Sequence, residues 1–155
     1  MTESVNYQID PAAAADVPEL AGLFDAYRVF YKAASMPAES EAFVRGLVAH
    51  GPTRFFLARE AEGSPALGFV HLMPSINTVA MRPIWLLEDL YVAPSGRRRG
   101  VASALMRHAE NFARETGAER LTLATAHDNK KAQSLYQRLG YIKEEHFWYY
   151  HRMLD

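Results

Sequence analysis

The pattern of apolar and polar positions along this chain predicts several short strands. The first is an alternation of Val5, Tyr7 and Ile9 with polar neighbours. Further apolar runs predict strands at 55–58, 67–72, 85–92, 121–126 and 147–153. The Glu-Gly-Ser-Pro segment at 62–65 predicts a hairpin turn between two of them. Large side chains at successive positions of 85–92 indicate a central strand that is covered on both faces.

Four segments place apolar residues at helical spacing. The first begins at Asp16, where Glu19 three residues later predicts a capping box. Its apolar stripe consists of Leu20, Leu23, Phe24, Tyr27 and Tyr31. The other helices are predicted around 43–48, at 100–116 with Gly117 as its C-cap, and at 130–139 with Gly140 as its stop. Strands interspersed with helices predict a single α/β domain over residues 1–155, built around a mixed sheet.

Composition and charge exclude several classes of function. Lysine and arginine total 17 against 18 acidic residues, so the net charge of −1 argues against a nucleic-acid-binding protein, which needs a basic excess. The absence of cysteine excludes disulfides and catalysis by a cysteine thiolate. The six histidines show no metal-binding spacing, so no metal is expected and the histidines are expected to be surface or packing residues. Residues 1–4 lack a signal pattern and no apolar run is long enough to span a bilayer, so we expect a cytoplasmic protein without membrane contact.

The most informative segment is 90–106, which is an apolar strand followed by a basic turn and an amphipathic helix. Four N–H groups at the start of a helix lack an internal partner, and the helix dipole makes that end partly positive, so it binds phosphate or pyrophosphate. Gly100 lets the backbone approach such an anion, and Arg97, Arg98 and Arg99 add charge and forked donors. The arginines taken alone are also typical of a solvated basic turn.

Two motifs carry a resemblance to a known family. The spacing Arg97-x-x-Gly100-x-Ala102 after a strand resembles the acetyl-CoA pyrophosphate loop of the GCN5-related N-acetyltransferases (GNAT), and the block at 129–141 resembles their second signature. The resemblance covers nearly the whole chain. It implies an α/β fold with a central mixed, mostly antiparallel twisted sheet flanked by helices on both faces, and acetyl-CoA as cosubstrate. The residues that it places against acetyl-CoA are Leu90, Tyr91, Val92, Arg97, Arg98, Arg99, Gly100, Val101, Ala102, Ser103, Asn129 and Tyr136.

Acetyl transfer from a thioester to an amine needs a deprotonated amine, a donor for the oxyanion and a proton for the departing thiolate. Glu88 is the candidate base. Its parity with Leu86 and Leu90 places these side chains on one face wherever no bulge interrupts the strand, and the resemblance places an acid here against the amine. The alternatives are a structural ion pair for this acid, or a water chain in place of a base. The resemblance also implies a β-bulge in this strand, a backbone N–H near Leu90 for the oxyanion, and the Val92 amide for the pantetheine arm.

The resemblance assigns Tyr136 as the acid that protonates the thiolate, although its helical spacing with Leu135 also suits a core aromatic. Asn129 is expected to cap the same helix and, by resemblance, to bond the pantetheine arm. Tyr27 and Tyr31 belong to helices that wall the acceptor site in this family. Aromatic rings can hold an ammonium group there, but tyrosines on a helix also simply pack.

The predicted function is transfer of the acetyl group of acetyl-CoA to a primary amine, with a small molecule or polyamine favoured as acceptor. Segments 72–75 and 85–92 resemble the histone/polyamine and diamine branch of the family. The alternatives are a protein N-terminal or lysine acetyltransferase and a non-catalytic acyl-CoA-binding module. The aromatic residues at 147–150 fit either the core or a surface covered by a second subunit, which leaves a homodimer open.

Overall fold

The computed structural model describes residues 5–155 and divides the chain into two compact units, of which the first ends at Ala124 and the second begins at Thr125. Residues 1–4, on which the expectation of a missing signal pattern rests, lie outside the described residues. No helix within residues 5–155 is both long enough and apolar enough to cross a membrane.

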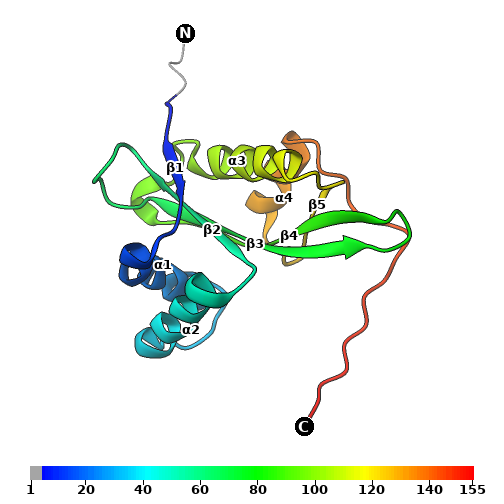
Figure 1. Cartoon of the computed structure of the whole chain (residues 1–155), viewed down its shortest axis with the longest axis horizontal. Helices are drawn as coiled ribbons and strands as arrows, with labels where there is room; N and C mark the ends of the chain where they lie inside the picture. Colours follow the sequence, from blue (N-terminus) through cyan, green and yellow to red (C-terminus); the bar gives the residue numbers. More distant parts are fainter. Residues whose placement is uncertain (1–4) are drawn as a thin grey trace. The chain divides into compact units, whose positions relative to one another are not determined.

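The first unit is built on a five-stranded sheet within the described residues (Figure 1). Its strands, in the same order along the chain and across the sheet, are β1 (Gln8–Pro11), β2 (Arg54–Arg59), β3 (Gly68–Asn77), β4 (Arg82–Val92) and β5 (Leu121–Leu123). Strands β1 to β4 pair antiparallel, whereas β5 pairs parallel with β4. The sheet is therefore mixed and mostly antiparallel, as predicted, and the pairing changes direction at β4.

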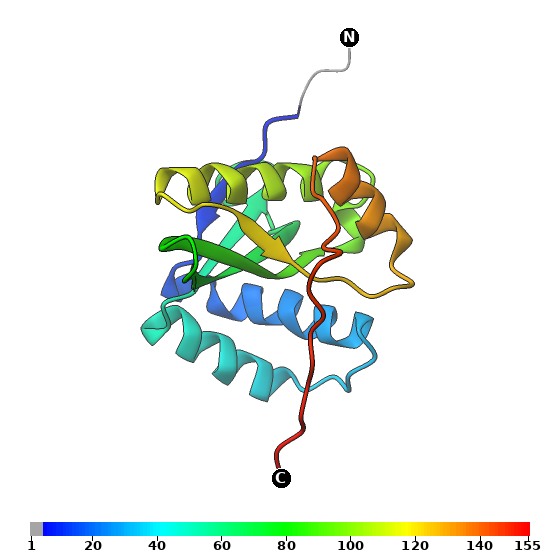
Figure 2. The same cartoon turned by 90° about the vertical axis from the view of Figure 1, so that its right-hand side faces the viewer.

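Helices cover both faces of this sheet, as Figure 2 shows for α3 on one face and for α1 and α2 on the other. Their bounds are α1 (Val17–Phe30), α2 (Pro37–His50) and α3 (Val101–Glu115), with short 3₁₀ turns at η1 (Ala14–Asp16) and η2 (Pro94–Gly96). On the α3 face, the ring of Phe112 lies 5.1 Å from that of Phe56 and 5.0 Å from that of Trp85. On the opposite face, Phe24 of α1 lies 6.5 Å from Phe69 of β3. The sheet thus has a separate apolar core on each face.

Helix α1 begins where the sequence predicts, but the predicted capping box is wrong. The Asp16 side chain caps no N–H of α1; its carboxylate accepts the N–H of Ala13 at 2.8 Å instead. Glu19 pairs with Arg59 of β2 at 2.5 Å, and it accepts the N–H of Ala66, in the connection between β2 and β3, at 2.9 Å. The two acids therefore serve contacts outside the helix, which a local pattern does not reveal.

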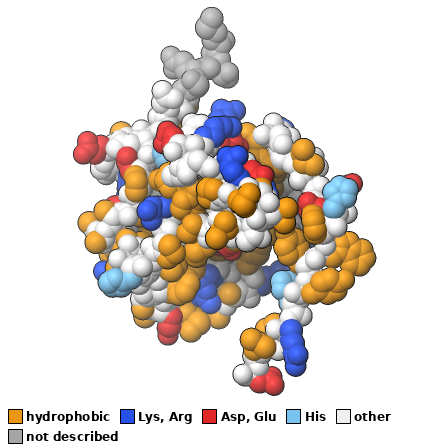
Figure 3. Space-filling model, turned by 45° about the vertical axis from the view of Figure 1, so that its right-hand side comes forward, with side chains coloured by type: hydrophobic (Ala, Val, Ile, Leu, Met, Phe, Trp, Pro, Cys, Tyr) orange, Lys and Arg blue, Asp and Glu red, His pale blue; other side chains and the backbone are white. Residues whose placement is uncertain are grey.

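The second unit contains α4 (Lys130–Arg138) and the C-terminal segment. Gly140, with φ of +89°, follows the helix as its predicted stop. The strand predicted at 147–153 is wrong, because this segment pairs with no strand among the described residues and its aromatic side chains are exposed. Figure 3 shows hydrophobic side chains, in orange, on the surface of the molecule. Aromatic residues favour a strand only where neighbouring strands offer them a packed surface, since β-propensity mostly reflects packing.

Candidate active site

Strand β4 contains a β-bulge at Glu88. His71 of β3 pairs with Asp89, whereas the next residue, Leu72, pairs with Leu87, so Glu88 is an extra residue without a partner on β3. A bulge in this strand is what the family resemblance predicts. It bends the strand and re-aims the side chains beside it.

The bulge overturns the parity argument for Glu88. Leu90 pairs with Val70 and Leu86 pairs with Met73. Val70 and Met73 are three residues apart on β3, so their side chains point to opposite faces of the sheet. Leu86 and Leu90 therefore lie on opposite faces, and Glu88 shares a face with at most one of them.

The two adjacent acids of β4 have different surroundings. Asp89 Oδ2 lies 2.6 Å from Nδ1 of His71, and the Asp89 side chain is only 17% exposed. Glu88 is exposed, and no hydrogen bond or ion pair reaches its carboxylate from residues 5–155. The alternative role of Glu88 in a structural ion pair therefore has no support in the described part of the chain. Glu88 is the acid that is open to an incoming amine.

Strand β4 loses its second neighbour at the bulge. β5 pairs only with residues 85–87 of β4, so residues 88–92 have no strand partner on that side within the described chain. The N–H and C=O groups of an unpaired strand edge are available to an extended ligand. Leu90, Tyr91 and Val92 lie in this stretch and are half-buried.

The turn between β4 and α3 passes twice through left-handed backbone. Arg98 has a φ of +60°, and Gly100, the residue before α3, has a φ of +77°. Glycine adopts this conformation without strain, whereas a residue with a Cβ does not. A Cβ built on Gly100 would meet no atom within 4 Å, so the space beside this backbone is open.

The backbone N–H groups of residues 98–103 form no hydrogen bond among the described residues. The first bond at the start of α3 runs from the N–H of Ala104 to the carbonyl of Gly100 at 3.0 Å. Successive N–H groups beside a left-handed residue form a concave site for anions, and the positive end of the helix dipole adds to it. The geometry of this turn therefore suits a phosphate or pyrophosphate group.

The three arginines of the turn differ in their contacts. The Arg97 guanidinium lies over the ring of Tyr91, 5.9 Å from its centroid. Arg99 forms an ion pair with Glu60. Arg98 is exposed, and its guanidinium contacts no acceptor within residues 5–155. Arg98 is therefore the solvated member of the run.

Tyr27 lies on α1 and Tyr31 directly follows this helix, on the face of the sheet that carries Tyr91. The Tyr27 ring is 6.4 Å from that of Tyr91 and 5.0 Å from that of Tyr31, and it packs against the apolar core of this face. Tyr31 is 45% exposed. Tyr27 thus has the packing role that was one of its two expected roles, and Tyr31 presents its ring to solvent.

A buried carboxylate holds the connection between α1 and α2 beside these tyrosines. Asp25 accepts hydrogen bonds from the hydroxyls of Ser35 and Ser40 at 2.6 and 2.8 Å, and from the N–H of Met36 at 2.8 Å. These bonds, that of Ser35 above all, hold the pKa of Asp25 below its usual value. The ionised Asp25 therefore stabilises the C-terminal end of α1 and the connection that follows it. Tyr31 is the first residue of this connection.

Two predicted site residues belong to the second unit. Asn129 caps α4, as predicted, because its Oδ1 accepts the N–H of Ala132 at 3.3 Å. Tyr136 is half-buried on α4, and its ring lies 6.0 Å from that of Tyr141. The first unit brings together Glu88, the β4 edge and the turn at 97–103, whereas Asn129 and Tyr136 are positioned by the second.

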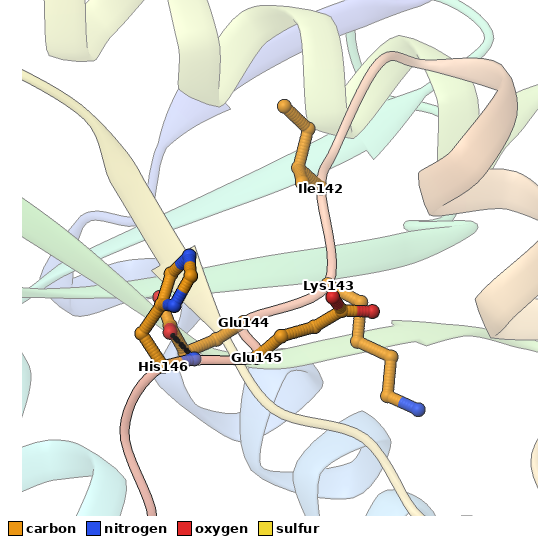
Figure 4. A pocket seen from close by; sticks show the side chains of 5 residues that line it. All are labelled: Ile142, Lys143, Glu144, Glu145 and His146. Carbon is orange, nitrogen blue, oxygen red and sulfur yellow. Dashed lines mark hydrogen bonds between the residues drawn. The ribbon is translucent and has the colours of Figure 1, made fainter.

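The second unit also has a hollow lined by residues 142–146, whose side chains Figure 4 shows. The backbone N–H groups of His146 and Phe147 donate to the Glu144 carboxylate, and the first of these bonds lowers the pKa of Glu144 most. These are local contacts of an exposed segment. The hollow is thus lined by the exposed side chains of one short segment, among them the charged groups of Lys143, Glu144 and Glu145.

Comparison with known proteins identifies the family. Residues 20–141 match the model of the acetyltransferase (GNAT) family. The chain belongs to this family. The "Uncharacterized N-acetyltransferase YhfO" of Bacillus subtilis (strain 168) is 36% identical over 142 residues, which are 92% of this chain and 94% of that protein. A crystal structure of a probable acetyltransferase superposes with a TM-score of 0.89 at 34% identity, covering 96% of this chain and 98% of that one.

The name of a third relative states the class of its substrate. The aminoglycoside N(6')-acetyltransferase type 1 of Acinetobacter haemolyticus is 31% identical over 80 residues, which are 52% of this chain and 55% of that protein. As a GNAT protein, the chain is an N-acetyltransferase, and acetyl-CoA is the cosubstrate of its family. Residues 5–155 contain no group of three or more side chains that could hold a metal ion.

One polar cluster of this GNAT enzyme was missed by sequence reasoning, which expected every histidine to be a surface or packing residue. His71 is 5% exposed and hydrogen-bonded to both Thr53 and Asp89. The available signal is that a histidine occupies a buried position of a predicted strand, two residues after Phe69. A buried polar side chain needs hydrogen-bond partners, so such a position predicts a network.

Replacing Arg98 by glycine is expected to stabilise the protein. Left-handed backbone costs a residue with a Cβ about 1–2 kcal/mol, and the exposed Arg98 side chain makes no described contact that would be lost. Part of this gain is offset by the larger entropy of glycine in the unfolded chain, so we expect a melting temperature higher by about 2–4 °C.

Arg97→Gly is the matched control for this substitution, since Arg97 has an ordinary φ of −71°. Thermal unfolding of the two variants is the measurement. A melting temperature of Arg98→Gly at or below that of the wild type would show that the left-handed turn stores no strain.

Proposed function

We propose that this GNAT enzyme transfers the acetyl group of acetyl-CoA directly to the primary amine of a small molecule, with residues 1–155 acting as one domain. The proposal is carried by the run of unpaired N–H groups at 98–103, which follows the open edge of β4 directly. The proposed mechanism uses an anion site, an extended binding edge and a free carboxylate. The first unit contributes a candidate for each.

In the proposed complex, the pyrophosphate of acetyl-CoA lies against the N–H groups at 98–103. The open space beside Gly100 and the unpaired start of α3 at Val101, Ala102 and Ser103 support this placement. The pantetheine arm then lies along residues 90–92 of β4 as an added strand. Asn129 is proposed to donate from Nδ2 to the same arm, because its Oδ1 is used in the helix cap.

The proposed reaction assigns one proton transfer to each of two side chains. The Glu88 carboxylate takes a proton from the acceptor ammonium, and the freed nitrogen attacks the thioester carbonyl. A backbone N–H near Leu90 donates to the oxyanion that forms. When the C–S bond breaks, Tyr136 gives its phenolic proton to the leaving thiolate and the nitrogen loses its second proton to solvent, so the products are an N-acetylated amine and CoA. Proton exchange with solvent then restores the Glu88 carboxylate and the Tyr136 phenol.

A small cationic amine is the favoured acceptor. Glu88 is exposed and unpaired among the described residues, and Tyr31, which follows α1, exposes a ring that lies beside the packed ring of Tyr27. A carboxylate and aromatic faces are the groups that bind an ammonium. The aminoglycoside acetyltransferase among the relatives and the polyamine-branch resemblance of residues 85–92 support the same class.

A turnover screen with acetyl-CoA tests this proposal. The acceptors are polyamines, amino acids, aminoglycosides and peptides with free N-termini or lysines, and CoA release is measured for each. We expect turnover with at least one small amine. Turnover with peptides alone would select the protein acetyltransferase, and acetyl-CoA binding without turnover on any amine would select the non-catalytic module.

Replacing Gly100 by aspartate is expected to abolish most of the stabilisation that acetyl-CoA gives. The new side chain adds strain at a φ of +77° and a negative charge beside the proposed pyrophosphate. A ligand at 100 times its Kd stabilises the folded state by about 2.7 kcal/mol, and this gain should be nearly lost in the variant. The measurement is the melting temperature with and without acetyl-CoA.

Gly117→Asp is the matched control, because Gly117 also has a φ of +77° and open space where a Cβ would lie. It follows the opposite end of α3, so the variant carries the same backbone strain and charge far from the proposed anion site. Acetyl-CoA should stabilise Gly117→Asp as it does the wild type. Equal ligand-induced shifts in the two variants would place the pyrophosphate elsewhere.

A further inference from the structure

Three polar side chains form a hydrogen-bonded chain across the sheet of the first unit. Thr53, directly before β2, bonds through Oγ1 to Nε2 of His71 on β3. Nδ1 of the same ring lies 2.6 Å from Oδ2 of Asp89 on β4. Thr53 Oγ1 also donates to the carbonyl of Leu72 at 2.8 Å. Thr53 and His71 are each 5% exposed, and Phe55 stacks on the imidazole at 4.1 Å, so protein atoms enclose the ring.

The donors and acceptors available to Thr53, His71 and Asp89 determine how many protons these three side chains share. Thr53 has a single hydroxyl proton and donates it to Leu72, so it accepts from His71, and Nε2 of His71 carries a proton. A bare Nδ1 would direct its lone pair at a carboxylate oxygen 2.6 Å away, so a second proton lies between Nδ1 and Asp89. His71 and Asp89 together hold one proton more than a neutral histidine and a carboxylate would.

The same side chains flank the step in register that creates the bulge. His71 is the last residue of β3 before the step and Leu72 is the first after it, and Thr53 bonds to both. Charge-assisted bonds in a buried setting are stronger than neutral ones. A one-residue change in register would move the bulge and send the following side chains of β4 to the opposite face.

We infer that His71 is a positioning residue, which holds the bulge at Glu88 through a protonated ring clamped between Thr53 and Asp89. The clamp also occupies Asp89, so that Glu88 alone of the two acids is presented to an acceptor. This inference rests on the proposed role of β4 and Glu88 in acetyl transfer. His71 itself touches no reacting group.

Nitrogen-15 NMR of the histidine rings tests the proton count directly. In the wild type at neutral pH, we expect both ring nitrogens of His71 to show the chemical shifts of protonated nitrogen. In Asp89→Asn the amide replaces the carboxylate, and we expect Nδ1 to lose its proton while Nε2 retains one. A wild-type ring protonated on Nδ1 alone would overturn the clamp, because Thr53 would then be the donor to His71.

Substitution of His71 tests the consequence for catalysis. His71→Phe preserves the stacking on Phe55 and removes both hydrogen bonds, and we expect kcat to fall by about 10²-fold, as small misplacements of catalytic groups cause. His108→Phe is the matched control, because His108 packs against Phe56 at 4.6 Å on the other face and has no hydrogen bond among the described residues. This control should retain the wild-type kcat.

A smaller change keeps the test valid if His71→Phe fails to fold. Thr53→Val deletes the hydroxyl at nearly constant shape and should lower kcat. Thr53→Ser keeps the hydroxyl and should retain a kcat close to that of the wild type. Wild-type kcat in both His71→Phe and Thr53→Val would overturn the positioning role. A wild type that acetylates no amine would instead refute the proposed function, while NMR would still decide the proton count.

Discussion

Replacing Tyr136 by phenylalanine is expected to lower the maximal rate of acetyl transfer by about 10²–10⁴-fold, the usual contribution of a general acid. The phenolic proton stabilises the thiolate only as the C–S bond breaks, so the loss should appear in kcat. Binding of acetyl-CoA should change little, because the hydroxyl acts on the transition state rather than on the ground state. The measurement is kcat with an accepted amine, under conditions where chemistry is rate-limiting.

Tyr141→Phe is the control for this variant, since Tyr141 is a second tyrosine of the same unit with its ring 6.0 Å from that of Tyr136. Both variants keep the aromatic packing and delete one hydroxyl. We expect wild-type kcat for Tyr141→Phe, with retained melting temperatures for both. If Tyr136→Phe folds and turns over at the wild-type rate, its hydroxyl is not the acid and the ring is a packing residue of α4.

Replacing Glu88 by glutamine is expected to lower turnover by about 10²-fold or more, because the amide keeps the shape of the side chain and cannot accept the amine proton. The deficit should grow as the pH falls, since the acceptor is then more fully protonated and depends more on the base. Acetyl-CoA should still bind, because the proposed anion site lies in the turn at 98–103. The pH dependence of kcat/KM measures the effect.

Glu88→Asp retains the charge on a shorter side chain and should keep part of the activity that Glu88→Gln loses. An unchanged pH–rate profile in Glu88→Gln would favour a water chain as the route for the amine proton. The structure sharpens this test, because Asp89 is bonded to His71 and does not substitute for Glu88 without breaking that contact.

Local sequence patterns predicted the elements of the anion site well. These elements are an apolar strand, a glycine at the N-terminal boundary of α3 and an amphipathic helix. Each of them is visible in residues that are close together in the sequence. The structure confirms the helix and the bulge that the family resemblance implied for the strand before it, and it shows in addition that Gly100 has a left-handed backbone. The Asn129 cap of α4 is likewise confirmed, because a cap joins residues three positions apart.

Patterns that depend on distant pairing were predicted less well. The parity of Leu86, Glu88 and Leu90 assumed a regular strand, and a single extra residue opposite His71 and Leu72 places Leu86 and Leu90 on opposite faces. The acids Asp16 and Glu19 look like a helix cap in sequence, yet both pair with Arg59 of β2. No local pattern contains the identity of a cross-strand partner.

The sequence by itself determined the family, the order of the helices and strands before residue 147, and the glycine-containing turn proposed to bind the anion, because these follow from glycine positions, hydrophobic periodicity and motif spacing along the chain. Only the tertiary structure decided which acid of β4 is engaged and which is free. That choice depends on the register between β3 and β4 and on Thr53, a residue that contacts His71 from 18 positions away. The tertiary structure also decided that residues 147–153 form no strand within the described chain. A segment with a strand-like sequence becomes a strand only where another strand completes its backbone hydrogen bonds.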